Sequence, residues 1–218
     1  MRSTSMTREY RVGVGAVLRR DDGRVNDPKS MLHRYLQSGR DALIWKLEGL
    51  SDFEMRRPMT STGTNLLGIV KHVASIEVEY FTKVFGRPCP VELPWFDDGA
   101  SPNADMWATA DESLDFIVGL YRESWRVSDV TITELELDAP GHVPWWGEAR
   151  RDTTLQTILV HMIAETHRHA GHMDIVREMI DGERGWNQGS PNLPSFDSSQ
   201  WSRYVEVVTS AAESFRGQ

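Results

Sequence analysis

The sequence is poor in the features on which several classes of protein depend. It has one cysteine, Cys89, which excludes an internal disulfide and a metal site built from paired cysteines. No apolar run approaches the roughly 20 residues of a membrane-spanning helix, and the polar N-terminus lacks the apolar segment of a signal peptide. Lys and Arg number 24 against 32 Asp and Glu, and no run of five basic residues occurs. We therefore expect a cytoplasmic protein with no nucleic-acid and no membrane partner.

The N-terminal glycines do not form a nucleotide-binding motif. Gly13 and Gly15 resemble the start of a dinucleotide-binding fingerprint, but no third glycine follows and no helical pattern begins there. The alternation in YRVGVGAVL instead predicts a short strand in an N-terminal accessory arm. We divide the chain into this arm, residues 1–25, and one helical domain, residues 26–218, with a C-terminal extension from about residue 183.

What the chain does contain is a series of amphipathic helical patterns. Apolar residues recur at helical spacing in four long stretches and a shorter last one: residues 28–50, 64–85, 109–130, 154–181 and 199–215. The connections between them are longer than packed helices need, and strand-like sequence is confined to the arm. The sequence predicts an all-α protein, a four-helix bundle with long inter-helix loops, an N-terminal arm or strand and a short C-terminal helix.

The helix expected at residues 154–181 carries an acid and three imidazoles on its inward face. At about 100° per residue, the side chains that share this face with the apolar ones are those of His161, Glu165, His169 and His172. A buried, unpaired carboxylate is costly, so we expect these groups to bind one another or a cation. Glu165 and His169 are one turn apart, the spacing that lets two side chains reach one metal ion. His167 points the opposite way and is expected to be solvated.

A third ligand is available on another helix. His72 lies on the apolar side of the helix expected at residues 64–85, so we expect it to point inward. If the two helices are neighbours, His72, Glu165 and His169 form a two-histidine, one-carboxylate site that keeps a fourth position for water or substrate. The alternative is that His72 is a hydrogen-bonded core histidine without a metal.

Four further residues are candidates for the same site. His161 and His172 lie one turn to either side of the ligand pair and are candidate catalytic or orienting groups. Trp145 and Trp146 precede the last bundle helix. They are either walls of a substrate pocket or aromatic anchors that pack the loop onto the core.

Three segments carry a resemblance to a known family: WKLEGLSD at residues 45–52, LLGIVKHVASIE at 66–77 and LVHMIAETHRHAGHMDIVRE at 159–178. With them the chain resembles the DinB/YfiT superfamily of metal-binding four-helix bundles, and within it the actinobacterial branch that includes mycothiol-dependent maleylpyruvate isomerase. The resemblance implies that His72, Glu165 and His169 hold one divalent ion. Glutamate at position 165, where many relatives have histidine, favours the isomerase branch.

These observations lead to three interpretations of function. In the first, a divalent metal ion, zinc before nickel, iron or manganese, activates a low-molecular-weight thiol such as mycothiol, and the thiol attacks an electrophilic small molecule in a transferase or isomerase reaction. In the second, a metal-bound water makes the protein a hydrolase, with His161 or His172 as the base. In the third, the bundle binds a metal or a ligand without catalysis. A homodimer is compatible with all three.

Overall fold

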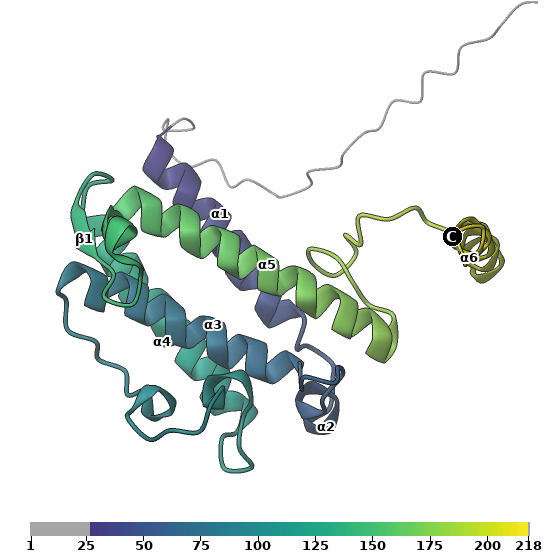
Figure 1. The fold of residues 1–218 in the computed structure, drawn as a ribbon, viewed down its shortest axis with the longest axis horizontal. Helices are drawn as coiled ribbons and strands as arrows, with labels where there is room; N and C mark the ends of the chain where they lie inside the picture. Colours follow the sequence, from purple (N-terminus) through teal and green to yellow (C-terminus); the bar gives the residue numbers. More distant parts are fainter. Residues whose placement is uncertain (1–26, 218) are drawn as a thin grey trace, which may run out of the picture.

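The computed structural model describes residues 27–217, so the strand and the arm predicted near the N-terminus lie outside the described residues. Over the described part the protein is a helical bundle, which confirms the predicted fold class (Figure 1). The long bundle helices are α1 Pro28–Trp45, α3 Leu66–Phe81, α4 Leu114–Glu134 and α5 Leu155–Asp181. Two further helices are α2 Asp52–Arg56 and α6 Ser198–Glu213.

The start of α1 and both ends of α5 follow the capping signals of the sequence. Asp27 caps α1 by accepting a hydrogen bond from the Ser30 amide, with proline at the first helical position. Thr154 caps α5, and Gly182 ends it in the left-handed conformation at φ 83°. Local chemistry therefore sets the start of α1 and both ends of α5, whereas α1 ends at Trp45 and not at the predicted residue 50.

α4 starts later than its sequence pattern predicts. The pattern places the start at Thr109, whereas α4 begins at Leu114 with Ser113 as its cap. Glu112 lies before the helix, where its carboxylate accepts hydrogen bonds from the Thr109 amide and the Lys71 ammonium group.

Two short elements differ from the sequence-based prediction. The segment between the first two predicted helices contains α2, where Ser51 and Glu54 form a reciprocal capping box. The prediction that strands are confined to the arm is wrong, because β1 Pro140–His142 pairs antiparallel with β2 Asp152–Thr154. Strands of three residues are too short to show an alternating pattern in the sequence.

α3 is the centre of the core. It packs against α4 on one side and α5 on another, while α1 packs against α5. Most of its side chains are buried, and Leu67, Val70 and Val73 have no exposed surface. A helix that is apolar on nearly every side needs neighbours around it, so α3 takes the central position and brings His72 next to α5.

A buried ion pair fixes the positions of three helices. Arg40 Nη2 of α1 lies 2.7 Å from Glu77 Oε1 of α3, and neither side chain is exposed. Arg40 Nη1 also donates to Asp129 Oδ1 of α4 at 2.8 Å. Removing one partner of a buried pair leaves an uncompensated charge, so these contacts favour a single arrangement of the helices.

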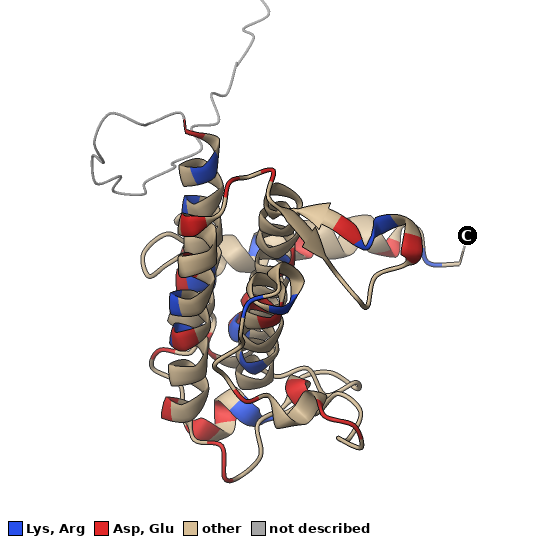
Figure 2. Cartoon of the chain, turned by 90° about the vertical axis from the view of Figure 1, so that its left-hand side faces the viewer, with Lys and Arg blue, Asp and Glu red and all other residues tan. Residues whose placement is uncertain are grey.

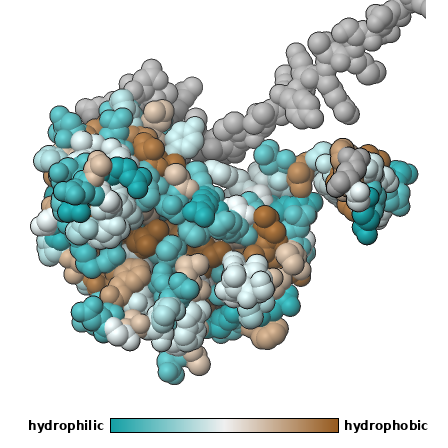
Figure 3. Space-filling view, in the orientation of Figure 1, coloured by the Kyte–Doolittle hydropathy of each residue, from teal (hydrophilic) through white to brown (hydrophobic). Residues whose placement is uncertain are grey.

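The surface carries no large region of one character on the faces drawn. Acidic and basic residues are interspersed along the helices in Figure 2, and Figure 3 shows separate apolar patches between hydrophilic ones. α6 stands apart from the bundle in Figure 1, and its Tyr204, Val205 and Val208 are exposed. Among the helices of residues 27–217, none combines the length and the apolarity needed to cross a membrane.

Candidate functional site

The three predicted metal ligands come together where α3 and α5 run side by side. The rings of His72 and His169 meet edge to face with their centroids 5.0 Å apart. Glu165 Oε2 lies 3.6 Å from His169 Nε2 on the same helix. The expectation that His72 points toward α5 therefore agrees with its position in the structure.

His72 is oriented by a residue that the sequence did not indicate. Its Nδ1 lies 2.6 Å from Oδ2 of Asp105, in the short 3-10 helix η3 Ala104–Met106. Burial raises the pKa of Asp105, but the hydrogen bond and the charge of His72 outweigh burial and lower the pKa below its ordinary value. A carboxylate on one ring nitrogen fixes the imidazole orientation and leaves Nε2 as the nitrogen available to a ligand.

His169 is held in the neutral form. Burial lowers its pKa to about 4, and the neighbouring His72 and His172 act in the same direction. Its Nδ1 is buried without a hydrogen-bond partner in the described part of the chain. At neutral pH this imidazole carries a lone pair, which is the form that binds a metal ion.

The kinds of donor atom at this site suit a divalent ion, but the side chains are not placed to hold one. Two imidazoles and a carboxylate form one of the ligand sets of catalytic zinc sites. In residues 27–217, however, no group of three or more His, Cys, Asp or Glu side chains is placed so that it could hold a metal ion. Glu165 lies beside His169, and His72 is held by its bond to Asp105, so the three donors are neighbours that do not converge on one point in this structure.

A small pocket extends from this site along the two helices. Its volume is about 240 Å³, and its lining residues are His72, Ile76, Glu79, Tyr80, Trp145, His161 and Glu165. Tyr80 meets His161 edge to face at a centroid distance of 4.8 Å, eight residues along each helix from the contact of His72 with His169. The two antiparallel helices thus line one pocket, with His72 at one end and Tyr80 and His161 at the other, and His169 contacts His72 without lining the pocket itself.

The two tryptophans before α5 take different positions. Trp145 lines the pocket, as one of the two interpretations predicts, and its Nε1 donates to the Tyr80 hydroxyl at 3.2 Å. Trp146 does not line it, but its Nε1 donates to the same hydroxyl at 2.9 Å and its ring packs against His161 at 5.0 Å. One indole is therefore a wall of the pocket and the other a support behind it.

The two candidate catalytic histidines also separate. His161 lines the pocket, and burial lowers its pKa although the charge of Glu165 acts in the opposite direction. His172 is exposed and lies outside the lining, with its ring centroid 5.4 Å from that of His169. Of the two, only His161 is placed to contact a substrate in this pocket.

The expectation that His167 is solvated is wrong. Both of its ring nitrogens are buried, and its ring packs against Trp186 at a centroid distance of 5.2 Å. A Cβ atom at Gly39 of α1 would lie 2.6 Å from His167 Nδ1, so α1 also covers this face. The helical pattern identified one buried face of α5, the face against α3. In the structure a second face of α5, which carries His167, is covered by α1.

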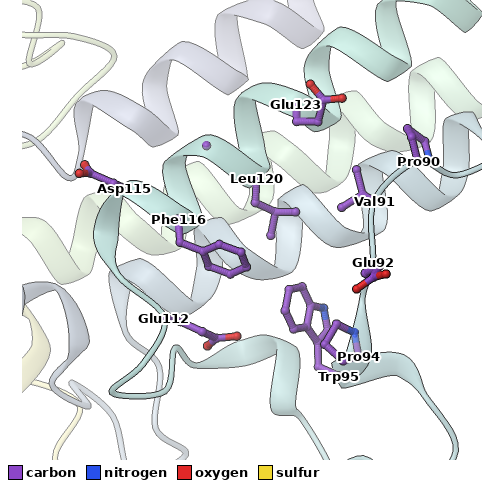
Figure 4. A pocket seen from close by; sticks show the side chains of 11 residues that line it. Pro90, Val91, Glu92, Pro94, Trp95, Glu112, Asp115, Phe116, Leu120 and Glu123 are labelled. Carbon is purple, nitrogen blue, oxygen red and sulfur yellow. The ribbon is translucent and has the colours of Figure 1, made fainter.

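A larger cavity lies elsewhere and has no comparable chemistry. It has a volume of about 570 Å³ and lies between the loop at residues 90–95 and α4 (Figure 4). Its lining residues include no imidazole and no thiol. Two of its carboxylates, Glu112 and Glu123, are paired with Lys71 and Arg126. The smaller pocket is therefore the candidate active site.

Comparison with known proteins agrees with this fold and with the predicted resemblance. A family model described as mycothiol-S-transferase matches residues 31–182, well over half of the chain. No curated protein matches. The crystal structure of a conserved protein from Enterococcus faecalis has a TM-score of 0.52 and 14% sequence identity, over 72% of this chain and 99% of that chain, which shows a shared fold. The chain belongs to the mycothiol-S-transferase family, a family of DinB-like helical bundles whose name supports a mycothiol-related transferase role.

Proposed function

We propose that this protein is a divalent-metal-dependent transferase that moves a low-molecular-weight thiol, mycothiol or a close analogue, onto an electrophilic small molecule. The observation that carries the proposal is that His72 and Glu165 line one pocket and both lie next to His169, in a chain of this family. Zinc suits two nitrogen donors and one oxygen donor, and nickel, iron or manganese also bind such sets.

In this proposal each residue around the ion has a separate part. Nε2 of His72, the Glu165 carboxylate and His169 would hold the ion, and Asp105 would keep the His72 ring in place. The bound ion supplies the positive charge that lowers the pKa of a thiol, so that the nucleophilic thiolate is present at neutral pH.

The thiol must come from outside the protein. Cys89 does not line the pocket, and its Sγ donates to the Val91 carbonyl oxygen at 3.4 Å. An exogenous thiol would enter at the histidine end, and the electrophile would lie between Ile76 and Trp145. His161, kept neutral by burial, lies at the Tyr80 end of the pocket and would contact the electrophile there.

Thiol consumption with and without metal tests the proposal. The metal is removed with a chelator. The rate at which mycothiol is consumed by reaction with an alkyl halide is then measured before and after zinc is restored. We expect the catalysed rate to disappear with the metal and to return with it, and His72→Ala to lack both metal and activity. His142→Ala is the matched control, because His142 bonds Asp152 in the hairpin, outside the pocket.

The same experiment separates the alternatives. A catalysed rate that persists in the fully metal-free protein contradicts the metal-dependent transferase. Hydrolysis of ester or amide substrates without any thiol would instead favour the hydrolase interpretation.

A further inference from the structure

The Tyr80 hydroxyl has an unusual set of hydrogen bonds. It accepts from Trp146 Nε1 at 2.9 Å and from Trp145 Nε1 at 3.2 Å. A phenol oxygen accepts through its lone pairs and donates one O–H. Within residues 27–217 no acceptor for that O–H occurs, although the side chain is only 7% exposed and lines the pocket. The two indoles thus occupy the accepting side of the hydroxyl and leave its proton for a group inside the pocket.

Tyr80 also lies at a suitable distance from His72, beside which the thiol would bind. His72, Ile76 and Tyr80 are four residues apart along α3, so about 12 Å of helix separates the first from the last. A molecule between them would have its reacting carbon toward His72 and a polar atom toward Tyr80. The pocket volume of about 240 Å³ is below the roughly 300–1,000 Å³ of drug-sized sites, so the molecule is small.

We propose that the Tyr80 hydroxyl donates a hydrogen bond to a substrate oxygen on which negative charge develops, and that the preferred electrophiles are therefore small α,β-unsaturated carbonyl compounds. This inference rests on the proposed thiol-transfer function and assigns its substrate class. Tyr80 is then a catalytic residue, and Trp145 and Trp146 position it. A donor fixed in advance toward developing charge favours the transition state, because no reorganisation is needed during the reaction.

The reaction is balanced without a further co-reactant. The thiolate sulfur forms a bond to the β-carbon, the C=C π electrons move into the conjugated system, and the carbonyl oxygen becomes an enolate oxygen. Tyr80 O–H stabilises that oxygen by hydrogen bonding and keeps its own proton. The proton that the thiol releases is balanced by the proton that the α-carbon takes up, so the product is the thioether carbonyl compound and nothing is oxidised or reduced.

The competing explanation is that Tyr80 only anchors the loop that carries the two tryptophans. An anchor affects every electrophile alike, because it shapes the whole pocket. A hydrogen-bond donor affects only electrophiles that develop charge on an oxygen. Two electrophiles therefore distinguish the explanations: 2-cyclohexenone, which forms an enolate, and 4-nitrobenzyl chloride, which releases chloride.

The test compares the zinc-loaded full-length protein with Tyr80→Phe and with Tyr204→Phe, a matched control on the exposed α6. With mycothiol as the thiol, we expect Tyr80→Phe to lower kcat/KM about 100-fold for 2-cyclohexenone and less than about threefold for 4-nitrobenzyl chloride. Zinc content should not change, and cyclohexanone, titrated by tryptophan fluorescence, should bind roughly two- to tenfold more weakly to Tyr80→Phe. Trp146→Phe keeps the hydroxyl and should keep most of the preference for the enone.

Equal slowing with both electrophiles, or no slowing with either, overturns the inference and leaves the proposed function standing. A Trp146→Phe variant that loses the preference as fully as Tyr80→Phe does also overturns it, since the effect then belongs to the loop. If the wild type reacts with the chloride but not with the enone, the inference is wrong and the proposed function still stands. A wild type that accelerates neither reaction overturns both proposals.

Discussion

His72 and Asp105 are 2.6 Å apart between Nδ1 and Oδ2, although 33 residues separate them in the sequence. The bond joins the middle of α3 to the loop before α4. It fixes which nitrogen of His72 faces α5, so the loop takes part in the geometry of the proposed metal site although it supplies no ligand.

The first prediction concerns this contact. Asp105→Asn removes the charge but keeps a side chain of the same shape, and we expect zinc affinity to fall about 10–100-fold with the helical content unchanged. Competition with a chromophoric chelator at fixed pH measures the affinity. Asp97→Asn, in an exposed part of the same connection, is the control and should match the parent. Equal affinity of all three proteins would show that Asp105 does not support the site.

The sequence was sufficient for the residues that lie on helices and insufficient for those that meet them from loops. His72, Glu165 and His169 follow from helical periodicity, because a helix of known phase fixes the direction of every side chain. Asp105 lies in a connection whose path depends on tertiary contacts, and no local pattern marks it. Tyr80 was identifiable in principle, since it follows His72 by eight residues on the same face, but its two indole partners come from the loop before α5.

His167 shows the converse error. A single apolar stripe was assumed to be the only buried face of α5, but α1 approaches closely where Gly39 provides space. Glycine allows this contact because it has no Cβ, and a sequence pattern confined to α5 contains no information about α1. The packing of one helix against two neighbours therefore had to come from the structure.

A second prediction tests that close contact. Gly39→Ala adds a Cβ that would lie 2.6 Å from His167 Nδ1 and 2.8 Å from Thr166 Cγ2, so we expect a loss of about 1–3 kcal/mol in the free energy of unfolding. Gly119→Ala in α4 is the matched control, since its added Cβ has no neighbour within 4 Å. There the better helix propensity of alanine should stabilise the protein by about 0.5–1 kcal/mol. Urea unfolding measures both, and two changes of the same sign would argue against the tight packing of α1 on α5.

A third prediction concerns acid stability. Burial raises the pKa of Asp129, but hydrogen bonds with His33 and Arg40 and the charge of Arg40 outweigh burial and hold the pKa below its ordinary value. Because the folded pKa is the lower one, the stabilisation is complete above the unfolded value of about 3.9 and disappears as the pH falls through the folded value. Asp129→Asn should therefore be less stable than the parent at pH 7, with a difference that shrinks below about pH 4.

Urea unfolding at pH 7, 4 and 3 measures this difference. Asp138→Asn, at an exposed position after α4, serves as the control and should not change the pH dependence. A difference between Asp129→Asn and the parent that stays constant over the three pH values would assign the role of Asp129 to its shape and not to its charge.

The last prediction separates Glu165 as a ligand from Glu165 as a proton acceptor. A ligating carboxylate supplies charge and a bond to the ion, whereas a general base supplies only proton transfer. Glu165→Gln should therefore weaken zinc affinity roughly tenfold or more if the carboxylate is a ligand, and should spare affinity while slowing turnover if it is a base. Glu165→His replaces one good ligand by another, so we expect the affinity order wild type, Glu165→His, Glu165→Gln in chelator competition.

A glutamine variant that binds zinc as tightly as the parent would remove Glu165 from the ligand set. The structure then ranks the remaining histidines. His172 has its ring centroid 5.4 Å from that of His169, whereas His161 packs between Tyr80 and Trp146 at the far end of the pocket. His172→Ala would be the next variant to lose zinc, and His161→Ala would keep it. The order of loss along α5 thus locates the ion beside the contact of His72 with His169, next to the end of the pocket that His72 lines.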